Sequence, residues 1–176
     1  TQQTNEQKEA ASWRESMYAV TAFAQSYFSK MLTESEEGKN IGLSYFKERG
    51  FTDESIERFH LGYSPDEWTA LTNAATDAGF QKEFLVSTGL TIEKRDKTFD
   101  RFKGRIMFPI HSMSGRVTGF GGRILKQDKQ AAKYMNSPES EVYQKSKVLY
   151  GLYQAKQHIA KESNCYLVEG YTDVIQ

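Results

Sequence analysis

The 176-residue sequence has a single cysteine, Cys165, and only three prolines. One cysteine cannot form an internal disulfide, and it excludes a cysteine-based zinc site, which needs about two to four sulfur ligands. The sequence also lacks any apolar run near the roughly 18–20 residues that span a bilayer. Its polar beginning, residues 1–9, is unlike a signal peptide. We therefore expect a cytoplasmic protein that does not enter membranes.

The sequence has no net charge, since it carries 23 Lys/Arg and 23 Asp/Glu, but the two signs are unevenly distributed. Residues 1–93 contain 8 Lys/Arg and 15 Asp/Glu, whereas residues 94–133 contain 11 Lys/Arg and 3 Asp/Glu. Such an asymmetry favours an anionic partner for the middle segment. The alternative is a basic surface that is merely solvated.

The N-terminal half of the sequence has the periodicity of helices. Apolar side chains recur at steps of three and four between Trp13 and Met31, which predicts one amphipathic helix over residues 12–34. Glycines that suit helix ends follow this segment and several later ones. Four further helices are expected, over residues 39–49, 53–59, 68–78 and 82–88.

From Phe102 onward the pattern is typical of strands. Alternating apolar residues around Phe108 predict a first strand, and residues 116–125 predict a return strand, so the pair forms a β-hairpin. Pro109 indicates an edge position or a site that needs no backbone donor. The return strand contains Gly119-Phe-Gly-Gly-Arg123, and glycines this dense in a strand require a bend, a bulge or a close approach by backbone or ligand.

The last third of the sequence returns to helices and ends on a pair of acids. Ser137 followed by a proline predicts a helix start, and residues 151–162 predict another helix. The apolar run 166–168 predicts a buried strand with Glu169 at its carboxyl end, where ligands gather in α/β sheets. A helix after Gly170 would bring Asp173 one turn from that glutamate.

Two carboxylates at this spacing suit a hard divalent cation such as Mg²⁺. The alternative is a solvated acid at a strand end, with Asp173 in the first turn of a helix, where its charge is favourable. The three histidines lie far apart and are expected to be structural, and no P-loop or Gly-x-Ser-x-Gly occurs. Carboxylates together with a basic hairpin suit phosphate chemistry, but spacing alone does not separate a polymerase from a nuclease or a ligase.

Five motifs in order make the sequence resemble the bacterial replicative primases of the DnaG type. They are Arg101-Phe-Lys-Gly-Arg-Ile-Met-Phe-Pro-Ile110, Gly119-Phe-Gly-Gly-Arg123, Lys133-Tyr-Met-Asn-Ser-Pro-Glu139, Leu149-Tyr-Gly151 and Val168-Glu-Gly-Tyr-Thr-Asp173. The resemblance implies synthesis of RNA primers on single-stranded DNA from ribonucleoside triphosphates, with Mg²⁺ or Mn²⁺. It implies an α+β fold with a helical N-terminal half, a β-hairpin or small sheet in the middle and the beginning of an α/β TOPRIM unit.

The same resemblance assigns roles to individual residues. Glu169 and Lys133 are expected to be catalytic, and Glu169 and Asp173 to bind the metal. Thr172 departs from the methionine that the family usually carries. The residues expected to contact nucleic acid or nucleotide are Arg49, Arg105, Arg123, Lys133, Tyr134, Asn136 and Lys145.

The resemblance also divides the chain and indicates what it lacks. Residues 1–160 are expected to form the N-terminal subdomain of the catalytic core, and residues 161–176 the first strand and turn of TOPRIM. The family's zinc-binding module, its later Asp-x-Asp metal ligands and its helicase-binding domain do not occur in the sequence, so we expect the chain alone to make no primers. The alternatives are a non-catalytic module that binds single-stranded DNA, and another TOPRIM enzyme such as a topoisomerase or nuclease.

Overall fold

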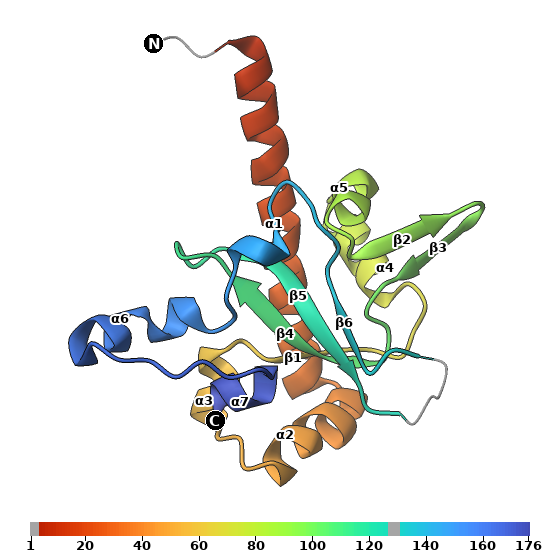
Figure 1. Ribbon diagram of the computed structural model, residues 1–176. Coiled ribbons are helices and arrows are strands. Elements are labelled where there is room, and N and C mark those ends of the chain that lie inside the picture. The colour runs from red at the N-terminus through yellow and green to blue at the C-terminus, as the bar shows by residue number, and fades with distance from the viewer. Residues whose placement is uncertain (1–3, 127–130) are drawn as a thin grey trace.

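A long helix, α1 (Asn5–Glu34), packs behind a four-stranded antiparallel sheet in the computed structural model, which describes residues 4–126 and 131–176 (Figure 1). Thr4 starts the helix with a capping box completed by Gln7. The buried stripe expected from the sequence is confirmed from Met17 to Leu32, and Trp13 packs on Phe84 with ring centres 4.9 Å apart. The sheet therefore rests on a single continuous helix.

The sheet has the strand order β1-β4-β5-β6. Its central strands are the predicted hairpin, now bounded as β4 (Arg105–His111) and β5 (Val117–Ile124). The short strands β1 (Gly62–Ser64) and β6 (Tyr134–Asn136) lie outside them and have no clear sequence pattern. Pro109 is therefore in a central strand rather than at an edge, but β1 pairs only with residues 105–107, so no strand requires a donor from the proline on that side.

Short helices surround the sheet and form the helical N-terminal half that the sequence predicts. The helix expected over residues 39–49 is divided into a π-helical turn η1 and helix α2. In the segment expected as the helix 68–78, the periodicity predicts a buried Trp68, but Trp68 is 67% exposed. A two-stranded hairpin that the sequence did not indicate follows them. The bounds are η1 (Gly38–Leu43), α2 (Ser44–Glu48), α3 (Asp53–Arg58), α4 (Ala70–Asp77), α5 (Lys82–Ser87), β2 (Thr91–Lys94) and β3 (Lys97–Asp100).

The C-terminal part contains the 3-10 turn η2 (Lys145–Lys147) and the helices α6 (Leu152–Glu162) and α7 (Tyr171–Ile175). The two helices confirm the expectation, but the helix predicted after Ser137 is wrong. The Ser137 hydroxyl accepts a hydrogen bond from the backbone amide of Phe120 instead of capping a helix, and residues 137–144 form no helix. None of the helices in the described ranges is long and apolar enough to span a membrane.

The buried strand predicted over residues 166–168 is also wrong. These residues are extended but pair with none of the described strands, and Tyr166 and Leu167 are 93% and 86% exposed. A run of apolar residues becomes a strand only when a neighbour completes its backbone hydrogen bonds. Glu169 therefore follows an open segment and not a sheet.

Helix α4 is capped from a distance, by Asp100 at the end of β3. Its carboxylate accepts hydrogen bonds from the backbone amides of Leu71 (2.7 Å) and Thr72 (3.1 Å) and from the Thr72 hydroxyl (2.5 Å). Asp100 is only 4% exposed, and burial raises its pKa while the Thr72 and backbone hydrogen bonds oppose that shift. Because α4 lacks a side-chain cap of its own, this contact fixes the small hairpin to the helix.

We expect Asp100→Ala to lower the free energy of unfolding by about 2 kcal/mol, because it leaves buried amide donors without partners. Urea denaturation of the purified chain measures this change. Asp96→Ala is the matched control, since Asp96 lies exposed in the turn between β2 and β3 and should change stability by less than about 0.5 kcal/mol. Equal losses in the two variants would contradict the capping role.

Candidate functional site

Two arginines from distant parts of the chain lie against one tyrosine ring. Arg49 follows α2, and its guanidinium carbon is 4.0 Å from the centre of the Tyr45 ring; that of Arg123, on β5, is 4.9 Å from the same centre. The Tyr45 hydroxyl also accepts a hydrogen bond from Arg123 Nη1. Tyr45 is buried, so its position is fixed by the core beneath it. The structure thus joins two of the predicted binding residues.

The cluster continues from Arg123 to strand β6. Arg123 Nη1 donates to the Tyr134 hydroxyl at 3.3 Å, and the guanidinium carbon lies 5.5 Å from the centre of that ring. Tyr134 is 39% exposed, and Lys133 beside it is exposed as well. We call Arg49, Tyr45, Arg123 and Tyr134 the arginine–tyrosine cluster.

The arginine–tyrosine cluster retains its positive charge. In the part of the chain that the structure describes, neither Arg49 nor Arg123 forms a salt bridge, and the buried Nε of Arg123 has no hydrogen-bond partner. Burial raises the pKa of Tyr45 although both guanidinium groups act to lower it, so this phenol stays protonated at neutral pH. Such a cluster attracts anions and offers ring faces to a planar group.

Arg105 does not belong to this surface, although the motif suggested a nucleic-acid contact. It is 4% exposed, and its Nη1 donates to the backbone oxygens of Ala132 at 2.9 Å and Lys133 at 3.3 Å. Burial also lowers its pKa. Its guanidinium holds the segment before β6 against the sheet, so we remove it from the set of proposed contacts.

Asn136 lies near the opposite end of β6 and is linked to α7. Its side-chain oxygen accepts a hydrogen bond of 2.6 Å from the hydroxyl of Tyr171, and the Tyr171 ring lies 6.3 Å from that of Tyr134. Tyr171 also stacks on Phe108 with ring centres 5.0 Å apart. The turn that carries the two acids is therefore attached to β6, the strand that follows Lys133.

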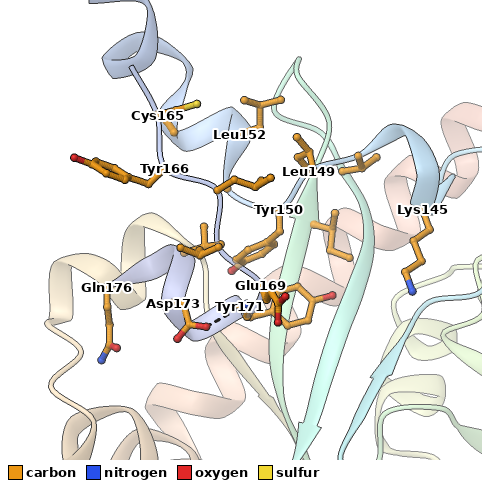
Figure 2. Close-up of a pocket in the computed structure, with 18 of the residues that line it drawn as sticks. Lys145, Leu149, Tyr150, Leu152, Cys165, Tyr166, Glu169, Tyr171, Asp173 and Gln176 are labelled. Carbon is orange, nitrogen blue, oxygen red and sulfur yellow. Dashed lines mark hydrogen bonds between the residues drawn. The ribbon is translucent and has the colours of Figure 1, made fainter. Parts of the chain in front are cut away.

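Glu169 and Asp173 flank the start of α7, and both are exposed (Figure 2). They line a cavity of about 700 Å³ between α6, α7 and the extended segment 164–168. Asp173 lies in the first turn of α7, as in the alternative interpretation of the sequence, and its Oδ2 also accepts a hydrogen bond of 3.2 Å from the backbone amide of Gly170. The described residues contain no group of three or more His, Cys, Asp or Glu able to hold a metal ion.

Two further contacts connect the predicted residues with this turn. The Gln176 side chain donates to the backbone oxygen of Arg49 at 2.6 Å, so the end of α7 touches the arginine–tyrosine cluster. Lys145 lines the same cavity as the acids, and its backbone amide donates a hydrogen bond of 3.0 Å to the Glu139 carboxylate. Lys145 is exposed (Figure 2).

Sequence reasoning missed Tyr45, Tyr171 and Trp68. The four-residue step from Tyr45 to Arg49 is a signal for the first, because such residues meet on a helix. For Trp68 the periodicity predicts a buried position, and its exposure depends on the tertiary fold. Lys103 lies 4.8 Å from the centre of the Trp68 ring, and Asp66 pairs with Lys103 and Lys126, which lowers the Asp66 pKa.

Comparisons with known proteins agree on one family. The family model described as the DNA primase catalytic core, N-terminal domain, matches residues 27–156. The DNA primase of Halalkalibacterium halodurans is 44% identical over 163 residues, which are 92% of this chain and 27% of that protein. The chain therefore spans about a quarter of that relative's length.

Two solved structures have the same fold. The RNA polymerase domain of Mycobacterium tuberculosis primase DnaG superposes with a TM-score of 0.85 at 37% identity, over 92% of this chain and 52% of that one. A DnaG primase catalytic domain bound to single-stranded DNA gives 0.85 at 34% identity, over 94% and 50%.

We expect Gly121→Ala to destabilise the chain by about 2 kcal/mol, because overpacking a filled site forces side chains from their positions. A Cβ atom at Gly121 would lie 2.5–2.6 Å from atoms of the Tyr171 ring. In a Tyr171→Ala background the same change should cost much less, which urea denaturation of the four proteins measures. An equal cost in both backgrounds would show that the strand itself, and not the ring, excludes the methyl group.

Proposed function

Because the chain belongs to the DNA primase catalytic core N-terminal domain family, we propose that it forms the template- and nucleotide-binding part of an enzyme that makes RNA primers during replication. The reaction is nucleotidyl transfer from ribonucleoside triphosphates along single-stranded DNA. Residues 1–160 act as the N-terminal subdomain of the catalytic core, and residues 161–176 as the beginning of the TOPRIM unit. The family match favours this activity over a topoisomerase or nuclease.

The arginine–tyrosine cluster is the observation that carries the proposal. Single strands bind proteins through cationic grooves that follow the phosphates and through aromatic rings on which bases stack. Arg49 and Arg123, which form no salt bridge with the residues that the structure describes, supply positive charge, and the exposed ring of Tyr134 supplies a face. Lys133, beside Tyr134, and Lys145, in the cavity with the acids, are both exposed and would add positive charge to the path.

Glu169 and Asp173 are the residues that would hold a Mg²⁺ or Mn²⁺ ion together with the phosphates of a nucleotide. Mg²⁺ usually keeps several waters and binds proteins through one or two carboxylates together with substrate phosphates, and the described chain offers an exposed pair. When bound, the metal neutralises the phosphate oxygens during transfer. The contribution of the chain is then to orient the triphosphate with Lys133, Lys145 and Arg123 and to stabilise the charge that develops on it.

Further partners follow from the same family expectation. A replicative helicase would bind through another part of the polypeptide, and zinc would be held by a separate module, since this chain has one cysteine. We propose a cytoplasmic setting, where replication takes place in bacteria. The chain taken alone, with two carboxylates and no third ligand among its described residues, binds single strands but makes no primers.

Single-strand binding tests the arginine–tyrosine cluster directly. We expect the purified chain to bind an oligothymidylate weakly. Arg123→Ala and Lys133→Ala should each weaken binding about threefold to tenfold. Each should also reduce the slope of log affinity against log salt concentration by the equivalent of about one phosphate contact. Fluorescence anisotropy over a salt series measures both quantities. Lys161→Ala, which removes an exposed lysine at the end of α6, is the charge-matched control. If both variants bound like the parent, the assignment of this surface would be wrong.

Primer synthesis tests the acids. In a polypeptide that extends this chain to the length of its relatives, we expect short RNA products with single-stranded DNA, four ribonucleotides and Mg²⁺ or Mn²⁺. Glu169→Gln should lower their yield at least about a hundredfold, because it removes a charged metal ligand, whereas Glu162→Gln in α6 should not. Undiminished synthesis by Glu169→Gln would refute its catalytic role. Products from the 176-residue chain alone would refute its proposed incompleteness.

A further inference from the structure

Tyr171 occupies a central place in the site, and neither the motifs nor the family match assigns it a role. It is the first residue of α7 and stands between Glu169 and Asp173 in the sequence. Its ring is parallel to that of Phe108, with an angle of 8°, and perpendicular to that of Tyr150, with centres 4.7 Å apart. These contacts hold the turn with the two acids against the sheet.

The Tyr171 hydroxyl reaches beyond these packing contacts to Asn136 on β6. It donates to the side-chain oxygen of Asn136 at 2.6 Å. Once the amide oxygen accepts this bond, the amide nitrogen with its two N–H donors must point the other way. Within the described residues, no atom accepts a hydrogen bond from that nitrogen.

We propose that Tyr171 is a positioning residue that turns the Asn136 amide into an oriented donor for the incoming nucleotide and keeps it in register with Glu169 and Asp173. The acceptor is a phosphate, ribose or base oxygen of the ribonucleotide. This inference rests on the proposed function, because it requires a nucleotide beside the arginine–tyrosine cluster. The contact between Tyr171 and Asn136 thus joins the acid-bearing turn and strand β6 into one unit.

A purely structural role for Tyr171 is the competing explanation, and Tyr171→Phe separates the two. The variant keeps the ring contacts with Phe108 and Tyr150 and removes only the hydroxyl. In the extended, primer-synthesising polypeptide, we expect its KM for ribonucleotides to rise about fivefold to tenfold while kcat stays within about twofold, the pattern of a lost binding contact. Asn136→Ala should give a similar rise, and the double variant should be no worse than Asn136→Ala alone.

Asn136→Asp provides a second test that leaves Tyr171 untouched. The aspartate still accepts the Tyr171 hydrogen bond but has no N–H to donate, so its KM should also rise about fivefold or more. Tyr63→Phe is the matched control, because it removes a buried tyrosine hydroxyl that donates to Glu37 at 2.9 Å, away from this contact. We expect it to keep the kinetic constants of the parent.

The outcomes separate this inference from the proposed function. If the parent makes primers but Tyr171→Phe has the parental KM, or if the effects of Tyr171→Phe and Asn136→Ala simply add, the positioning role is overturned and the proposed function remains. If the extended parent neither makes primers nor binds single strands, the proposed function fails first. If Tyr171→Phe and Asn136→Ala both raise KM and their effects do not add in the double variant, the result supports both the positioning role and the proposed function.

Discussion

Direct approach of large side chains to the backbone of β5 is the constraint on which the rest of the structure depends. Three glycines leave that room: a Cβ at Gly119 would lie 3.1 Å from the Tyr143 ring, one at Gly121 2.5 Å from Tyr171, and one at Gly122 2.7 Å from Phe102. The central strand thus receives the core on one side and the α7 turn on the other. Glycines would weaken a strand that stood alone, but in β5 they provide the contact surface on which the site is assembled.

Packing against an aromatic ring explains how two positive charges can lie close together in the arginine–tyrosine cluster. Arg49 and Arg123 would repel each other, but they lie against one tyrosine whose ring face carries negative potential. Lys103 and Lys126 differ from this pair, because both lie against the carboxylate of Asp66, which offsets one of their two charges. A cluster that is held by aromatic rings instead of acids keeps its attraction for phosphate, and its geometry is set before any ligand arrives.

Much of the fold could be predicted from the sequence because it depends on the local periodicity of apolar residues. The stripe of α1, the β4–β5 hairpin and the helix after Gly170 depend on residues close in sequence. Strand β1 has three residues, too few for a pattern, and the segment 166–168 has strand composition without a strand beside it. Similarly, motifs indicated Arg49 and Arg123, but only tertiary packing brought Arg123 to the Tyr45 ring and buried Arg105.

The two tryptophans of the chain differ in exposure, and this gives the protein a built-in optical reporter. Trp13 is partly buried against Phe84, whereas Trp68 is 67% exposed beside Lys103. Emission from Trp68 should therefore lie at longer wavelength and be quenched by iodide or acrylamide far more readily than that from Trp13. Events at the Asp66–Lys103 surface and events at the contact between α1 and α5 can then be followed separately in the unlabelled protein.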